Sequence, residues 1–170
     1  MSKEGKGRVT VQVKFGGVEQ TFEGSVENVW LSVNRFFGEF VPSFDVAKKL
    51  MLNVDLQRLV EDCRGVVAFS PEGANVLVSR DRLTDNETLM LWLLAGYVGF
   101  RLGLLKSDCF FKDELQVKLG KSAKIVSTRL GELVKDGLVL KVDENYRIST
   151  LCIVQMQKDV LPRIRAKLQS

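Results

Sequence analysis

The chain has 170 residues, of which 45% are hydrophobic and 27% are charged, with a formal net charge of +4. This balance is ordinary for a folded protein with a hydrophobic core and leaves room for one or two domains. The chain has no histidine, the commonest general base and zinc ligand, so composition argues against an enzyme and we expect no cofactor or metal.

The excess positive charge lies in the second half of the chain. Residues 1–80 carry ten Lys or Arg and ten Asp or Glu, whereas residues 81–170 carry fifteen and eleven. A basic half favours a polyanion as its partner.

The N-terminal stretch predicts a β-hairpin. Residues 1–7 are polar and predict a frayed tail, and residues 8–15 then alternate between hydrophobic and polar side chains, as a half-buried strand does. Gly16 and Gly17 suit a two-residue turn that needs positive φ at both positions. Residues 18–23 are the expected partner strand.

A helix with a wide hydrophobic stripe is expected next, with Ser25 as its N-cap. The stripe consists of Val26, Val29, Trp30, Val33, Phe36, Phe37 and Phe40. We expect it to pack on the hairpin; the alternative is that it lines a ligand pocket. Pro42 should end the helix, and Ser43 can cap another one that extends to about Leu52.

The remainder of the first half predicts a helix over residues 54–63 and a second hairpin from strands at 65–70 and 75–79. The order hairpin, helices, hairpin predicts a small N-terminal α+β domain at residues 1–80.

Residues 81–84 are polar and should join this domain to the next. Thr84 or Asp85 can cap a helix, and residues 89–105 are nearly all hydrophobic. A membrane span needs about 20 hydrophobic residues. Because this stretch is shorter and contains Arg101, a helix buried in the protein is the better interpretation.

Two shorter helices should follow a loop at residues 107–108. The first covers residues 110–119. Ser122 caps the second, in which Val126, Leu130 and Leu133 recur at helical spacing and form a hydrophobic face.

A final hairpin should follow this helix. Gly137 stands where a helix end needs a left-handed residue. Strands are then expected at residues 138–140 and 146–148, with a turn at 143–145.

Three sequence segments carry a family resemblance: LGKS at 119–122, VSTRL at 126–130 and LVKDGLV at 133–139. The region from about residue 82 to residue 150 resembles a winged helix-turn-helix domain. The resemblance implies an overall α+β protein whose second domain, residues 81–170, is a winged helix-turn-helix with an added C-terminal helix.

The resemblance also implies that the second helix of the pair enters the major groove of DNA. The expected DNA-binding residues are Lys121, Ser122, Lys124, Ser127, Thr128, Arg129, Lys141, Asn145 and Arg147. Arg129 is the residue best able to read guanine; the alternative is a salt bridge to Glu132 or to a neighbouring helix. Asp143 and Glu144 at the expected wing tip oppose contact with phosphate.

A homodimer is expected, since symmetric dimers are common among such DNA readers. Gly96, Gly99 and Gly103 indicate close approach of another helix, in this chain or, as we favour, in a second subunit.

The C-terminal helix, capped by Ser149 or Thr150, should be interrupted at Pro162. Its hydrophobic stripe packs on the domain or pairs in a dimer, and it consists of Ile153, Met156, Val160, Ile164 and Leu168. Its basic residues suit solvent at a helix C-terminus or, alternatively, a phosphate backbone, and they are Arg163, Arg165 and Lys167.

Cys63, Cys109 and Cys152 are widely spaced among hydrophobic residues, which predicts buried thiols. The N-terminus has no signal-peptide core, so a cytoplasmic location is expected.

Two functions remain open at this point. The first is a transcription regulator that binds double-stranded DNA and does not associate with a membrane. The second is a winged-helix module for protein–protein contact in a larger assembly. The sequence indicates neither a target site nor a role for the N-terminal domain.

Overall fold

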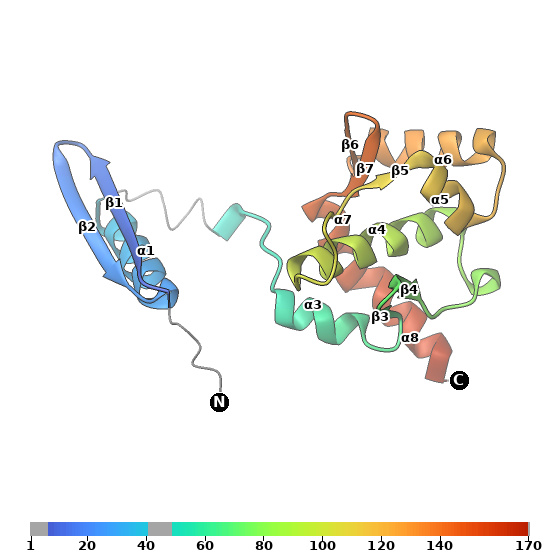
Figure 1. Ribbon diagram of the computed structural model, residues 1–170, viewed down its shortest axis with the longest axis horizontal. Coiled ribbons are helices and arrows are strands. Elements are labelled where there is room, and N and C mark those ends of the chain that lie inside the picture. The colour runs from blue at the N-terminus through green and yellow to red at the C-terminus, as the bar shows by residue number, and fades with distance from the viewer. Residues whose placement is uncertain (1–6, 41–48, 170) are drawn as a thin grey trace. The chain divides into compact units, whose positions relative to one another are not determined.

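The computed structural model describes residues 7–40 and 49–169 and has an α+β fold (Figure 1). The chain divides into two compact units, unit 1 (residues 1–51) and unit 2 (residues 52–170). This boundary differs from the one predicted at residues 80 and 81. The reason is that Leu59, Val66 and Val78 are buried in the same core as the helix that follows them.

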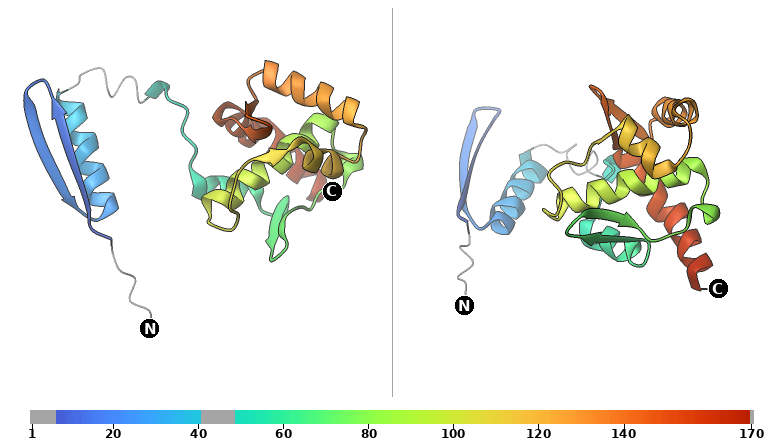
Figure 2. Two further views of the ribbon diagram at one scale, coloured as in Figure 1. Left: turned by 45° about the horizontal axis from the view of Figure 1, so that its top comes forward. Right: turned by 45° about the vertical axis from the view of Figure 1, so that its right-hand side comes forward.

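Unit 1 is a hairpin covered on one face by a helix. Strands β1 (Val9–Phe15) and β2 (Val18–Gly24) are antiparallel, and Gly16 and Gly17 between them have φ of 57° and 83°. Helix α1 (Val26–Phe40) lies along one face of the hairpin (Figures 1 and 2). The predicted hairpin and helix are confirmed.

The hydrophobic stripe of α1 is only partly covered. Val29 and Phe36 are buried, and the ring of Phe36 packs edge-on against Phe22 at a centroid distance of 6.0 Å. Val26 and Trp30, however, are 60% and 64% exposed. The expectation that the whole stripe packs on the hairpin is therefore wrong, because a two-stranded sheet is too narrow to cover it.

Three of the sequence predictions cannot be compared with the structure. The tail at residues 1–6, the side chain of Phe40, and Pro42 with most of the helix predicted over residues 43–52 lie outside the described residues.

Helix α4 (Asp85–Arg101) is the centre of unit 2, and eleven of its residues are buried. On one side of it lie α3 (Leu56–Cys63) and the antiparallel strands β3 (Val67–Ser70) and β4 (Gly73–Val76). On the other side lie α5 (Lys112–Leu119), α6 (Ala123–Lys135) and a small sheet (Figure 1). The predicted buried helix is confirmed, and no helix in the described ranges is long and apolar enough to cross a membrane.

A capping box fixes the start of α4. The Thr84 hydroxyl accepts a hydrogen bond from the Glu87 N–H at 3.2 Å, and the Glu87 carboxylate accepts one from the Thr84 N–H at 2.9 Å. A short 3₁₀ turn, η1 (Arg80–Arg82), precedes this cap.

The glycines of α4 contact side chains of the same chain. A Cβ on Gly96 would collide with the ring of Phe110, and one on Gly99 would lie 2.6 Å from Leu105 and Phe69. Close approach is therefore real, but the neighbour is neither another helix nor a second subunit. Gly103 lies beyond the end of α4, with φ of 73°.

The small sheet of unit 2 contains a strand that the sequence did not predict. Strand β5 (Phe110–Phe111) pairs with β7 (Asn145–Ile148), which pairs with β6 (Val139–Val142). Helix α5 therefore starts at Lys112 rather than at residue 110, because pairing with a strand more than 30 residues away holds the two phenylalanines extended.

The C-terminal segment consists of α7 (Thr150–Gln155), the π-helical turn η2 (Met156–Val160) and α8 (Leu161–Gln169). The wider turn precedes Pro162, which cannot donate a backbone hydrogen bond, so the predicted interruption is confirmed. The stripe packs on its own unit, where Ile153 and Ile164 are buried, although Leu168 is 41% exposed.

The basic residues of α8 hold this segment in place. Arg163 forms an ion pair with Glu87 of α4, and Arg165 lies 4.0 Å from Asp62 of α3. The side chain of Arg82 donates to the backbone oxygen of Lys167 at 2.9 Å. The sequence suggested solvated side chains for Arg163 and Arg165, but both form ion pairs within unit 2.

Candidate nucleic-acid interface

The buried face of α6 fixes the direction of its other face. Val126, Leu130 and Leu133 are almost fully buried, as predicted. Gly120 ends α5 with φ of 67°, and the Ser122 hydroxyl accepts a hydrogen bond from the Ile125 N–H at 3.4 Å. The turn and the cap together hold α6 against the core.

The opposite face of α6 is a continuous exposed strip without an acidic residue. At about 100° per residue its members lie within about a third of the helix circumference. We call it the α6 stripe, and it consists of Lys124, Ser127, Thr128, Gly131 and Lys135. Neither lysine forms an ion pair among the described residues. The sequence prediction omitted Gly131 and Lys135, although their spacing from Lys124 by seven and eleven residues marks the same face.

Gly131 has no role in internal packing. No heavy atom lies within 4 Å of the position that its Cβ would occupy. A glycine inside a helix costs about 1 kcal/mol relative to alanine. The absent side chain leaves the middle of the α6 stripe low enough for another surface to approach the backbone closely.

Arg129 lies on the flank of α6 rather than in the stripe. Its guanidinium lies 3.0 Å from the Glu132 carboxylate and 3.8 Å from that of Asp85 in α4. Both contacts agree with the alternative expected from the sequence, a salt bridge to Glu132 or to a neighbouring helix. Reading of a base by Arg129 would require these pairs to open.

Arg80 joins the N-terminal end of α6 from a distant part of the sequence. Its guanidinium packs on Gly120, next to Lys121, so that a side chain on Gly120 would collide with it. Lys121 and Lys124 are exposed, as is Ser122. The structure thus brings together three of the predicted residues and adds one basic residue that no local pattern could reveal.

The β6–β7 hairpin does not collect its predicted residues on one face. Lys141 pairs with Tyr146 and shares its face with Val139, whereas Arg147 pairs with Leu140 on the other face. Asn145 is half-buried. Lys141 and Arg147 therefore point to opposite sides, and only one of them can meet a given ligand.

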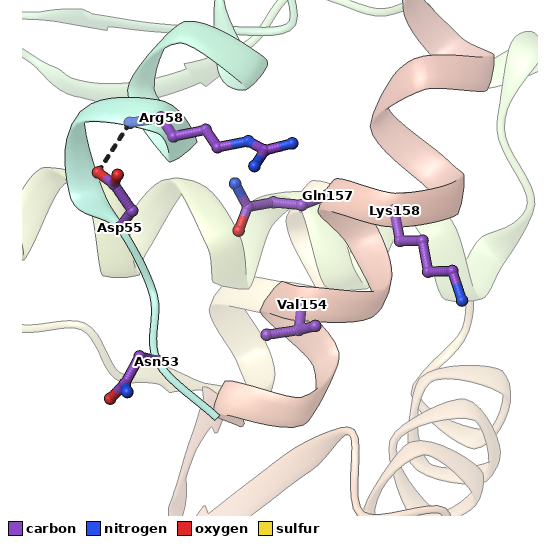
Figure 3. A pocket seen from close by; sticks show the side chains of 6 residues that line it. All are labelled: Asn53, Asp55, Arg58, Val154, Gln157 and Lys158. Carbon is purple, nitrogen blue, oxygen red and sulfur yellow. Dashed lines mark hydrogen bonds between the residues drawn. The ribbon is translucent and has the colours of Figure 1, made fainter. Parts of the chain in front are cut away.

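A polar hollow of about 290 Å³ lies between α3 and η2, and Figure 3 shows its lining. Arg58 and Lys158 supply positive charge there. Two other polar groups are already used by the fold, since the Asp55 carboxylate caps α3 and the Gln157 amide donates to Asp62 at 2.7 Å. The hollow has no group suited to nucleophilic or metal chemistry.

The described residues contain no cluster of three or more Cys, Asp or Glu side chains that could hold a metal ion. Burial raises the pKa of Cys63 and of Cys152 to about 12, and both thiols are buried as predicted. Cys109 is only half-buried, which the sequence did not predict.

No protein-family model, no curated protein and no solved structure matches this chain.

Proposed function

We propose that this protein is a DNA-binding transcription regulator that uses unit 2 as a winged helix-turn-helix and acts as a homodimer. The order of α4, β5, α5, α6, β6 and β7, with three helices and a three-stranded sheet, supports the resemblance stated from the sequence. In that arrangement α6 is the recognition helix.

The observation that carries the proposal is the α6 stripe. Lys124 and Lys135 are eleven residues apart, which corresponds to about 16 Å along a helix. The major groove is about 12 Å wide. Lysines at the two ends of α6 therefore suit phosphates on both walls of the groove, while Ser127, Thr128 and the bare backbone at Gly131 face the base edges between them.

Protein–protein contact through the same domain is the second candidate, and two observations favour it. Arg129 is already neutralised by two carboxylates. The turn of the β6–β7 hairpin carries Asp143 and Glu144, both exposed, which a phosphate backbone would repel.

Binding to random duplex DNA, followed by fluorescence anisotropy over a series of salt concentrations, tests the proposal. Neutralised phosphates predict a linear fall of log affinity with log salt, with a slope of about −0.9 per phosphate contact. Lys124→Glu combined with Lys135→Glu should lower affinity by about 100-fold or more and flatten the slope.

The matched control is Arg58→Glu combined with Lys158→Glu. It makes the same change in charge at the hollow between α3 and η2, which no residue of α6 lines (Figure 3). It should leave affinity nearly unchanged. Equal losses in the two double variants would show that only net charge matters, and salt-independent or absent binding by the wild type would favour the protein-contact candidate.

A further inference from the structure

The described part of unit 1 buries few hydrophobic side chains. Among residues 7–40 the buried hydrophobic side chains are Val13, Val29 and Phe36. Within this range, Phe15 is 45% exposed and Trp30 is 64% exposed. A two-stranded hairpin is marginally stable in water, and units of this size usually need a further element or a second subunit.

Among residues 7–40 no third strand pairs with the hairpin, and its two edges differ in chemistry. Gly16 and Gly17 form a two-residue turn, so Phe15 and Val18 are a hydrogen-bonded pair. Because such pairs alternate along antiparallel strands, the N–H and C=O groups of every second residue point away from the partner strand. On β1 these residues are Thr10, Gln12 and Lys14, and on β2 they are Glu19, Thr21 and Glu23.

Charged side chains protect the β2 edge but not the β1 edge. Glu19 and Glu23 flank Thr21 on β2, and charge on an edge strand discourages pairing with another chain. On β1 the only charge is Lys14, whose ammonium lies 3.3 Å from the Glu19 carboxylate across the hairpin. Seven regular residues without proline or a bulge leave the β1 edge open for pairing.

The β1 strand is complementary to itself. Antiparallel pairing of two copies centred on Gln12 places Gln12 opposite its counterpart and Thr10 opposite Lys14. It also places Val9 opposite Phe15 and Val11 opposite Val13 on the face that α1 covers. No like charges meet. The equivalent pairing of two β2 strands, centred on Thr21, would set Glu19 against Glu23, which is unfavourable.

We infer that unit 1 is a dimerisation module in which the β1 strands of two copies pair antiparallel and form a four-stranded sheet. A two-fold axis perpendicular to this sheet puts both α1 helices on one face. The inference rests on the proposed homodimer and assigns its interface.

Sedimentation equilibrium of the full chain tests the interface. The wild type should be a dimer at tens of micromolar. Gln12→Pro removes an edge N–H that makes no bond to β2, and it should weaken dimerisation by at least about 100-fold. Thr21→Pro makes the same change on the β2 edge and should leave the dimer intact, with circular dichroism confirming the fold of both variants.

A charge-complementation experiment avoids the risk that proline unfolds the hairpin. Gln12→Glu and Gln12→Lys should each weaken the dimer, since equal charges then face each other across the axis. An equimolar mixture of the two variants should restore dimers.

Three results would overturn the inference: a monomeric wild type, a dimer that resists Gln12→Pro, or dissociation by Thr21→Pro alone. A monomer that still binds duplex DNA through the α6 stripe would remove the dimer and leave the proposed DNA binding intact. A dimer insensitive to Gln12→Pro would remove only this interface.

Discussion

The two units of this chain are built from similar elements but differ in how they cover their hydrophobic residues. Unit 2 has a core of 22 buried residues contributed by elements from α3 to α8, and eleven residues of α4 are buried. The described part of unit 1 buries three hydrophobic side chains and leaves Trp30 and Phe15 in solvent.

Because of this difference, the exposed α6 stripe of unit 2 and the exposed hydrophobic residues of unit 1 have different meanings. In unit 2 the core is complete, so the polar α6 stripe is a surface that folding leaves available. In unit 1 the exposed residues Val26 and Trp30 are hydrophobic and continue the buried stripe of α1. A polar stripe on a domain with a complete core suits a polar ligand, whereas an exposed hydrophobic face indicates contact with another protein surface.

The largest expected effect comes from deleting the same atoms in the two units. Leu94→Ala in α4 should lower the free energy of unfolding of unit 2 by about 3 kcal/mol, because Leu94 is fully buried and the change leaves a cavity. Leu31→Ala in α1 should cost less than about 0.5 kcal/mol, because that side chain is 64% exposed and points away from the hairpin.

Urea unfolding can follow each unit separately, since the chain has two tryptophans, Trp30 in unit 1 and Trp92 in unit 2. Replacing either by phenylalanine leaves one fluorescent reporter. A large loss for Leu31→Ala would mean that the outer face of α1 is covered and would undo the contrast between the units.

The second effect concerns the ion pair that fixes α8 on α4. Arg163→Met should destabilise unit 2 by about 2 kcal/mol at pH 7, since a charge-assisted hydrogen bond to Glu87 is lost. The ion pairs of unit 1, such as Lys14–Glu19, are exposed, so the analogous Lys14→Met should have little effect.

The effect of Arg163→Met should depend on pH. Burial acts to raise the pKa of Glu87, but hydrogen bonds from Thr84 and Arg163 outweigh burial and hold the pKa below 4.5. A lowered carboxyl pKa stabilises the fold above pH 4.5, and this contribution is lost as the pH falls through the folded-state pKa. The difference between variant and wild type should therefore shrink in acid, and a constant difference would contradict the assignment.

The smallest expected effect is the difference in stability between an alanine placed on the surface of unit 2 and one placed in its core. Gly131→Ala on the α6 stripe should raise stability by about 1 kcal/mol, because the helix gains alanine's propensity and nothing obstructs the methyl group. Gly96→Ala is the control and should destabilise, because its Cβ would press on Phe110. Thermal unfolding of both variants gives the comparison, and a loss for Gly131→Ala would mean that the stripe is packed.

Several sequence predictions hold because their signals are local. The pair Gly16-Gly17 closed the first hairpin, Ser122 and Thr84 capped their helices, and Gly137 has the left-handed φ of 71° expected after α6. Capping and positive φ depend on a few neighbouring residues, which a sequence displays directly.

The misplaced features all depend on distant residues. Phe110 and Phe111 are extended because β7 pairs with them, and the domain boundary moved because Leu59 and Val78 pack on α4. For Arg129 the sequence left base reading and a salt bridge open, and it could not name Asp85, more than 40 residues earlier, as a partner 3.8 Å away.

By itself the amino-acid sequence determined the α+β class, the hairpins, the caps and the two-faced character of α6, since periodicity and turn residues encode them. Only the tertiary structure decided which charges of α6 remain unpaired, where one unit ends, and that α1 keeps part of its hydrophobic stripe in solvent. Charge pairing and side-chain burial depend on residues that are distant in the sequence and adjacent in the fold. A short sequence pattern contains no information about which distant residues become neighbours.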